Sequence, residues 1–313
     1  MIKTEEDPKD QSFWHITLIL TMNRKKQQAI KSAESVAALR AAAYKEKDKN
    51  LRCSDDLASC FLNTPYRLLT SIRPHRLLKK ILHKMSPGSY HFAITRTKHF
   101  DEILKKEALN GIEQLVILGA GYDTRAIRFQ DLLKSVDVYE VDFYATQENK
   151  RKILHKKVKD IPENIHFIPV DFNKDSFEAA LEFHGFETDK KTLFLWEGVS
   201  YYLPEAVVRH ILCFVSSCKN GSSIVFDYAL EKFVKGDYST FGGEEIAKWL
   251  KKIQEPFLFG LEPTQTTTFL TECNLTLCSD LSPEELEQKY LKTQSGEIAG
   301  KTLGHVHMAH AIV

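Results

Sequence analysis

Residues 114–142 read QLVILGAGYDTRAIRFQDLLKSVDVYEVD and decide the fold class. An apolar run at residues 115–118 leads into Gly119-Ala120-Gly121, and a second apolar run ends at Asp142, 21 residues after Gly121. Glycines at the end of a strand let a ligand approach the backbone, because no Cβ blocks it. An acid closing the next strand can accept both hydroxyls of a ribose. The stretch therefore predicts a Rossmann-like turn that binds a nucleoside-containing cofactor.

The same turn favours one cofactor over another. A dinucleotide site places a third glycine where the helix begins, next to the pyrophosphate, and here that position holds Thr124, after Tyr122 and Asp123. An acidic, bulky helix start suits S-adenosylmethionine better, since that cofactor has no phosphate and carries a cationic sulfonium. Two alternatives stay open at this point: a merely structural turn, and an NAD-dependent oxidoreductase.

The bulk composition excludes several classes of partner. The 313 residues carry 43 basic and 42 acidic side chains, well mixed, which argues against a nucleic-acid groove. The basic runs at residues 24–26 and 150–159 are typical of solvated helix faces. The six cysteines form no CxxC pair, so we expect reduced structural thiols and no metal site. The apolar residues 13–22 are too few to cross a bilayer, which predicts a cytoplasmic protein without a membrane contact.

The chain divides into a helical part and an alternating part. Helical spacing predicts helices at residues 32–44, with Ser32 as N-cap, and at 55–62, 66–83 and 90–109. Strands are expected at residues 114–118, 136–141, 166–170, 192–196 and 223–227, with helices between them at 125–134, 144–158, 176–183 and 204–218. Such alternation predicts βαβ units and a parallel sheet. Residues 275–278 and 305–313 suggest a final antiparallel pair.

These elements predict one domain over residues 1–313. Residues 1–110 would form a helical cap, and residues 111–313 a Rossmann-like core. The glycine-containing segment 232–262 would be inserted as a lid over the carboxyl edge of the sheet, where ligands of open α/β sheets bind.

With these residues placed, the chain resembles the leucine carboxyl methyltransferase family, and within it the bacterial S-adenosylmethionine-dependent branch. The resemblance runs from about residue 32 to the C-terminus and rests on four blocks: residues 32–40; Arg96 with Phe100 and Asp101; residues 118–128 with 139–142; and residues 197–204. It implies a class I methyltransferase fold, with a seven-stranded, mostly parallel sheet, a reversed last strand and an N-terminal helical cap.

The resemblance also implies contacts with the methionine part of the cofactor. Arg96 would pair with the cofactor's carboxylate, and Glu197 would face its ammonium. Gly119 and Gly121 would leave room for the methionine chain along the backbone. Without the resemblance, a salt bridge would be the ordinary interpretation of Arg96.

Further residues would hold the nucleoside part. Asp142 would accept the ribose hydroxyls, although it could instead cap the helix that begins near Tyr144. Asp171 would accept from the adenine amine, and the backbone of Phe172 would meet the ring edge; an Asp-Phe pair after a strand could also be a simple cap.

The acceptor side is less defined by the sequence. Tyr201 and Tyr202 are candidates for substrate contact or for lid packing. A lysine-containing N-terminal segment of the eukaryotic phosphatase methyltransferases has no clear counterpart, which argues against that substrate. An ionised carboxylate acceptor needs no general base, whereas a hydroxyl or phenol does, and no histidine stands out for that role. We therefore expect O-methylation of a carboxylate on a small molecule or peptide C-terminus. The alternatives are a hydroxyl or phenol acceptor and a non-catalytic protein that binds the cofactor.

Overall fold

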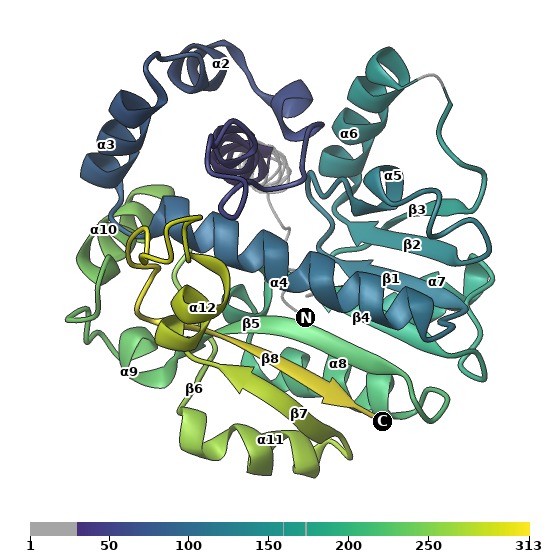
Figure 1. Cartoon of the computed structure of the whole chain (residues 1–313). Helices are drawn as coiled ribbons and strands as arrows, with labels where there is room; N and C mark the ends of the chain where they lie inside the picture. The colour runs from purple at the N-terminus through teal and green to yellow at the C-terminus, as the bar shows by residue number, and fades with distance from the viewer. Residues whose placement is uncertain (1–29, 159, 173) are drawn as a thin grey trace, which may run out of the picture.

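One twisted sheet organises the molecule in a computed structural model, which describes residues 30–158, 160–172 and 174–313 (Figure 1). Its strands are β1 (Gln114–Leu118), β2 (Asp137–Asp142), β3 (Ile165–Pro169), β4 (Thr192–Trp196), β5 (Ser223–Leu230), β6 (Gly260–Leu261), β7 (Thr276–Leu281) and β8 (Val306–Ile312). Their order is β3-β2-β1-β4-β5-β8-β7, with β6 beside the end of β5. Strand β8 runs antiparallel to both β5 and β7. The predicted sheet with a reversed last strand is confirmed, and β6 adds an eighth strand of two residues.

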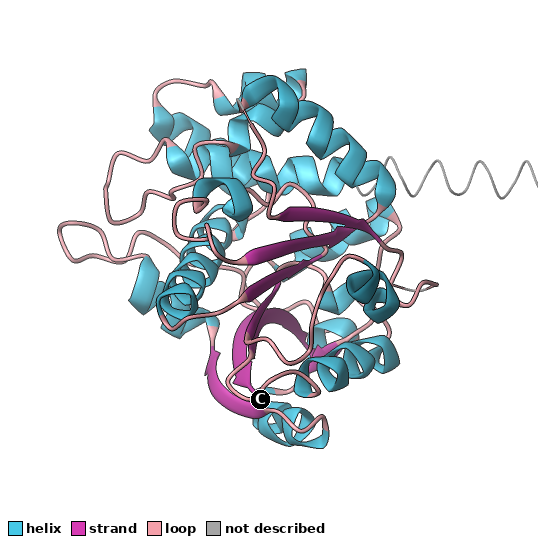
Figure 2. Cartoon of the chain, turned by 90° about the vertical axis from the view of Figure 1, so that its right-hand side faces the viewer, coloured by secondary structure: helices cyan, strands magenta, loops and turns pink. Residues whose placement is uncertain are grey.

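Helices cover both faces of this sheet (Figure 2). They are α2 (Thr64–Thr70), α3 (His75–Met85), α4 (Ser89–Leu109), α5 (Arg125–Arg128), α6 (Tyr144–Lys157), α7 (Phe177–Phe183), α8 (Glu205–Ser216), α9 (Glu231–Val234), α10 (Gly243–Ile253), α11 (Thr266–Glu272) and α12 (Pro283–Tyr290). Residues 30–44 form a further helix near the start of the described chain, and short 3-10 turns are η1 (Ala58–Phe61), η2 (Ser200–Tyr202) and η3 (Pro263–Gln265).

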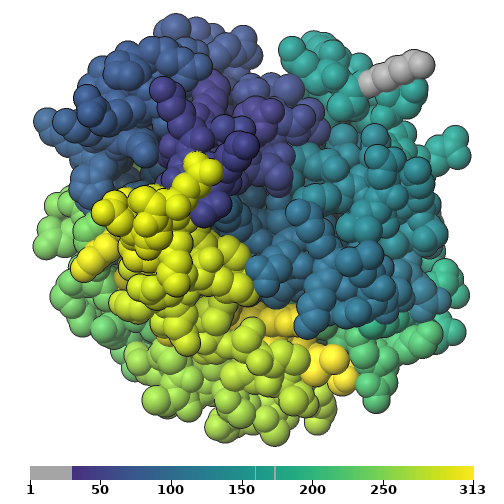
Figure 3. Space-filling model, in the orientation of Figure 1, coloured from purple at the N-terminus to yellow at the C-terminus, as the bar shows by residue number. Residues whose placement is uncertain are grey.

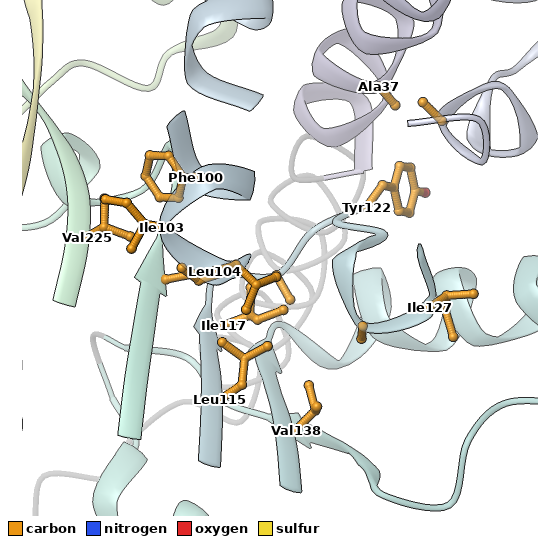
Figure 4. Packing of buried hydrophobic residues seen from close by; sticks show 14 of the residues in the cluster. Ala37, Phe100, Ile103, Leu104, Leu115, Ile117, Tyr122, Ile127, Val138 and Val225 are labelled. Carbon is orange, nitrogen blue, oxygen red and sulfur yellow. The ribbon is translucent and has the colours of Figure 1, made fainter. Parts of the chain in front are cut away.

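Alternate side chains of β1 divide the core into two layers, as a strand buried on both faces requires. Leu115 and Ile117 pack toward α4, where Figure 4 shows them next to Leu104. Val116 and Leu118 belong to the opposite layer, which α7, α8 and α11 cover. The strand is thus held from both sides, which fixes the position of the turn that follows it.

The N-terminal helices pack on the sheet through the first of these layers. Ala37 of the helix at residues 30–44 and Phe61 of η1 share a buried cluster with β1 and β2. Figure 3 shows the C-terminal segment, in yellow, lying against the N-terminal helices, and there the backbone N–H of Gln294 donates to Asp48 Oδ2 at 2.9 Å.

Several predicted helix boundaries were wrong. Ser32 lies inside a helix that has already begun at residue 30, so it is no N-cap. The helix predicted over residues 66–83 is two helices. The helical hydrogen bonding is interrupted between Thr70 and His75, where Pro74 has no N–H to donate. Residues 55–62 hold only the 3-10 turn η1.

The helix predicted over residues 125–134 ends at Arg128. Strand β2 begins at Asp137, so a helix through residue 134 would leave too little chain to reach it. Residues 129–136 instead reach β2 through tight turns, in which the N–H groups of Leu132 and Leu133 both donate to the carbonyl of Phe129.

The segment 232–262 contributes α10 and β6, and its lid role stays a prediction. The antiparallel pair expected from residues 275–278 and 305–313 is confirmed as β7 and β8, although α12 lies between them in the chain. Residues 13–22 and 24–26 lie outside the described part of the chain. Within the described residues, no helix has the length and apolarity needed to cross a membrane.

Candidate active site

The turn after β1 has a backbone that requires glycine. Gly119 and Gly121 have φ values of +66° and +48°, in the left-handed region that side chains disfavour. A Cβ on Gly119 would also lie 2.3 Å from Cγ2 of Val199. The N–H groups of Gly119 and Ala120 donate to the carbonyl of Val141 at 2.8 and 3.0 Å, which ties the turn to the end of β2.

Asp142, the last residue of β2, faces this turn. Its Oδ2 accepts from the N–H of Gly121, and its Oδ1 accepts from the N–H of Phe143 at 2.5 Å. No side chain caps α6, so the helix-cap interpretation of Asp142 is wrong. Burial raises the pKa of Asp142, and the two backbone N–H groups oppose that rise.

A buried ion pair joins α6 to Glu140, two residues before Asp142 on β2. Lys150 Nζ lies 2.6 Å from Glu140 Oε2, and both side chains are almost fully buried. Lys150 is therefore no part of a solvated helix face, contrary to the prediction for residues 150–159. Burial raises the pKa of Glu140 to about 7, with Lys150 acting in the opposite direction.

Asp171 and Phe172 follow β3 at the same edge, because β3 runs parallel to β2 and pairs Pro169 with Asp142. Asp171 lies in a turn, where its N–H donates to Asp175 Oδ2 at 2.8 Å and its Oδ2 lies 3.2 Å from Lys174 Nζ. The structure thus brings Asp171 to the edge where Asp142 ends β2.

Arg96 and Glu197 lie in direct contact. Arg96, on α4, is only 5% exposed, and its Nε lies 3.1 Å from Oε1 of Glu197, which follows β4. Its Nη1 donates to Oδ2 of the fully buried Asp227 at 3.0 Å and lies 3.5 Å from the hydroxyl of Tyr201. Burial raises the pKa of Asp227, and Arg96 counteracts this rise.

A second arginine, which the sequence analysis did not single out, also contacts Glu197. Arg125, the first residue of α5, donates through Nη1 to Oε2 of Glu197 at 2.7 Å and to Asp123, and through Nε to Oδ1 of Asp101 at 2.7 Å. Arg125 and its neighbours hold the pKa of Asp123 down to about 2 despite burial. The only local signal was the YDTR sequence, which does not reveal partners 24 and 72 residues away.

The ion pairs continue from Arg125 into the helical cap. Arg128 reaches Asp101 at 3.0 Å and Asp55 at 3.7 Å, and Arg40 reaches Asp55 at 2.7 Å. This network joins four arginines to five carboxylates: Arg40, Arg96, Arg125 and Arg128 with Asp55, Asp101, Asp123, Glu197 and Asp227. With every member ionised it carries one excess negative charge, and Asp142 adds another nearby. The edge of the sheet therefore suits a cationic ligand.

Aromatic side chains gather beside Arg96. The rings of Tyr201 and Tyr202 lie 5.0 Å apart, and the ring of Phe257, from the predicted lid segment, lies 4.2 Å from Tyr201 and 5.1 Å from Tyr202. Burial raises the pKa of Tyr201. The two tyrosines thus pack against the lid segment and border the arginine network.

Comparison with known proteins identifies the family. The sequence profile described as "Leucine carboxyl methyltransferase" matches residues 33–216, more than half of the chain. The chain belongs to the leucine carboxyl methyltransferase family. Among its curated relatives, "Putative S-adenosyl-L-methionine-dependent methyltransferase YktD" of Bacillus subtilis is 31% identical over 238 residues, 75% of this chain and 76% of that protein. A Streptomyces avermitilis protein of the same description is 30% identical over 185 residues, 59% of this chain and 64% of its own.

Solved structures show the same fold at low sequence identity. The structure of a Thermobifida fusca protein, described as a "putative methyltransferase", aligns with a TM-score of 0.57 and 15% identity, over 88% of this chain and 93% of that one. A DUF574 family protein from Streptomyces avermitilis gives a TM-score of 0.57 and 11% identity, over 89% and 96%. This member of the leucine carboxyl methyltransferase family is an S-adenosylmethionine-dependent methyltransferase with a Rossmann-like class I fold, rather than a dehydrogenase.

The residues at the sheet edge fit that cofactor. The site has excess negative charge, which suits a ligand with a sulfonium and an ammonium. The buried Nε of Arg96 has no hydrogen-bond partner among the described residues, so its contact with Glu197 is an ion pair without an aligned hydrogen bond. A donor thus remains for a carboxylate ligand. Among the residues that the structure describes, no group of three or more His, Cys, Asp or Glu could hold a metal ion.

Proposed function

We propose that this enzyme transfers the methyl group of S-adenosylmethionine to a carboxylate oxygen of a small molecule or a peptide C-terminus. The cofactor, when bound, supplies a methyl carbon activated by a positively charged sulfur. The acceptor oxygen attacks that carbon in line, a C–O bond forms as the S–C bond breaks, and the electron pair stays on sulfur. The protein contributes mainly proximity and alignment.

Arg96, Glu197 and the glycine turn would hold the methionine part of the cofactor. Arg96 would pair with the carboxylate of the cofactor and Glu197 with its ammonium, beside Gly119 and Gly121. Both side chains are already held by charged neighbours, so little ordering is needed on binding.

The adenosine half would lie along the ends of β2 and β3. Asp142 would accept the ribose hydroxyls, Asp171 the adenine amine, and the backbone of Phe172 would meet the ring edge. Tyr201 and Tyr202 would border the methyl acceptor. Their aromatic side chains favour an acceptor molecule with an apolar or aromatic part.

One observation carries the choice of a carboxylate acceptor. The acidic side chains at this edge are engaged: Asp142 by two backbone N–H groups, Glu197 by two arginines, and Asp227 by Arg96 and the N–H of Gly198. Burial lowers the pKa of the nearby His305 to about 3, so its imidazole is a weak base. A carboxylate is already ionised and needs none of these groups to remove a proton.

The chemistry of the product tests this proposal. The protein would be incubated with S-adenosylmethionine labelled in the methyl group and either a low-molecular-weight bacterial extract or synthetic peptides with free C-termini. We expect label that mild alkali releases as volatile methanol, because methyl esters hydrolyse and methyl ethers do not. Alkali-stable label would instead establish a hydroxyl or phenol acceptor, and cofactor binding without transfer would favour the non-catalytic alternative.

Replacing Asp142 tests the cofactor site separately. We expect Asp142→Ala to weaken S-adenosylmethionine binding about tenfold or more, because charge-assisted hydrogen bonds to two hydroxyls are lost. Calorimetric titration would measure the affinity. Asp137→Ala, at the half-exposed opposite end of β2, is the matched control and should bind like the wild type. Equal affinities of the two variants would remove Asp142 from the site.

A further inference from the structure

Arg125 joins three parts of the active site through one guanidinium. The side chain is 3% exposed and contacts Asp101 on α4, Asp123 in the turn after β1, and Glu197 after β4. Its Nη2 also donates to the carbonyl of Thr97, at 3.5 Å. A planar guanidinium with fixed donor directions can hold several carboxylates in one geometry, which an ammonium does poorly.

The two oxygens of Glu197 have different partners. Oε1 lies 3.1 Å from Arg96 Nε without an aligned hydrogen bond, whereas Oε2 accepts a hydrogen bond of 2.7 Å from Arg125 Nη1. Arg96 therefore contributes an ion pair to Glu197, whereas Arg125 contributes a directional hydrogen bond. The orientation of the Glu197 carboxylate depends on Arg125.

Charge sharing leaves Glu197 able to attract a cation. Arg125 faces two further carboxylates, Asp101 and Asp123, and Arg96 also faces Asp227. Two guanidiniums are thus divided among four carboxylates, so neither neutralises Glu197 alone. Burial works against the charge of Arg125, but these carboxylates outweigh it and raise its pKa.

We infer that Arg125 is a positioning residue that orients Glu197 toward the ammonium group of S-adenosylmethionine. The inference rests on the proposed function, in which Glu197 faces that group. It has a specific consequence. Loss of the Arg125 contact should weaken ligands that carry the amino-acid end of the cofactor and spare ligands that lack it.

Two natural ligands separate these cases. S-adenosylhomocysteine contains the amino-acid end, and 5′-methylthioadenosine has the same adenosine and sulfur without it. The wild type, Arg125→Lys and Arg125→Gln would be titrated with both. We expect the ratio of the two affinities to fall about tenfold in Arg125→Gln, with methylthioadenosine binding changed less than about twofold. Arg125→Lys keeps the positive charge but loses the planar pair of guanidinium donors. Its affinity ratio should therefore lie between those of the wild type and Arg125→Gln.

Arg128→Lys is the matched control. Arg128 shares Asp101 with Arg125 and is also buried, but its contacts run to the cap through Asp55 and Ser54. This variant should lower stability while leaving the affinity ratio unchanged.

Two other results would overturn the inference. Equal loss of both ligands in both Arg125 variants would reduce Arg125 to a structural residue, with the proposed function intact. Equal binding of both ligands by the wild type would mean that Glu197 does not contact the ammonium group of the cofactor. That result would overturn this part of the proposed function together with the inference.

Discussion

Replacing Arg96 by methionine should lower the free energy of unfolding by about 3–5 kcal/mol. The substitution keeps much of the side-chain volume but removes the one cation that, among the described residues, forms an ion pair with the fully buried Asp227. Asp227 would keep the N–H of Gly198, at 2.6 Å from Oδ1, as a donor. A single neutral donor does not offset the loss of the charge, because an uncompensated carboxylate is costly in a dry interior. Urea denaturation at pH 7 would measure the change.

A second substitution identifies the cause. Asp227→Asn removes the stranded charge, so the double variant Arg96→Met/Asp227→Asn should be more stable than Arg96→Met by about 2 kcal/mol or more. Arg209→Met is the surface control, because Arg209 also contacts two carboxylates, Glu205 and Glu272, but in solvent. That control should lose no more than about 1 kcal/mol. Additive losses in the double variant would contradict this explanation.

The sequence contained the parts of the site that depend on local chain geometry. The four-residue apolar run, the two glycines and the acid 21 residues after the second glycine could be recognised in the sequence, because each depends on its own backbone conformation or on its place at a strand end. The structure brings Gly121 and Asp142 into contact as that pattern indicates. Parallel strands then carry Asp171 and Glu197 to the same edge, since their carboxyl ends meet there.

The arginine network was not readable from the sequence in the same way. Arg96 and Asp227 are 131 residues apart, and Arg125 and Glu197 are 72 apart, so no periodicity relates them. Arg125 looks like an ordinary first-turn residue until the sheet places β4 next to β1. The predicted helix boundaries were wrong for a related reason. The length of α5 is set by the distance to β2, and the helix propensities of its residues carry no information about that distance.

Three buried histidines should make stability depend on pH. Burial lowers the pKa of His99 on α4 to about 4, that of His305 just before β8 to about 3, and that of His310 on β8 to about 4. Because their folded-state pKa values lie below the ordinary value, the unfolded chain binds more protons. Their contribution to stability is present above about pH 6.5 and is lost as the pH falls. Glu140, whose pKa is raised, acts in the opposite direction over the same range.

A single variant isolates one of these contributions. His305 is fully buried and stacked on Phe233 at 4.0 Å, and its Nδ1 lies 3.5 Å from Thr240 Oγ1. In the described part of the chain, its Nε2 has no hydrogen-bond partner. We expect wild type to lose about 2 kcal/mol of stability relative to His305→Gln between pH 7 and pH 5, because only the wild type must keep an imidazole neutral. Urea denaturation of both proteins at pH 7 and pH 5 would measure how the difference between their free energies of unfolding changes with pH.

The control for that experiment is a histidine that folding leaves in water. His155 is exposed on α6, so His155→Gln should keep a constant stability difference from wild type at pH 7 and pH 5. A constant difference for His305→Gln as well would mean that His305 accepts its proton without unfolding. In that case the segment between β5 and β8 would have to open enough to hydrate the ring, since an imidazolium has no described acceptor at Nε2 and would otherwise be buried uncompensated.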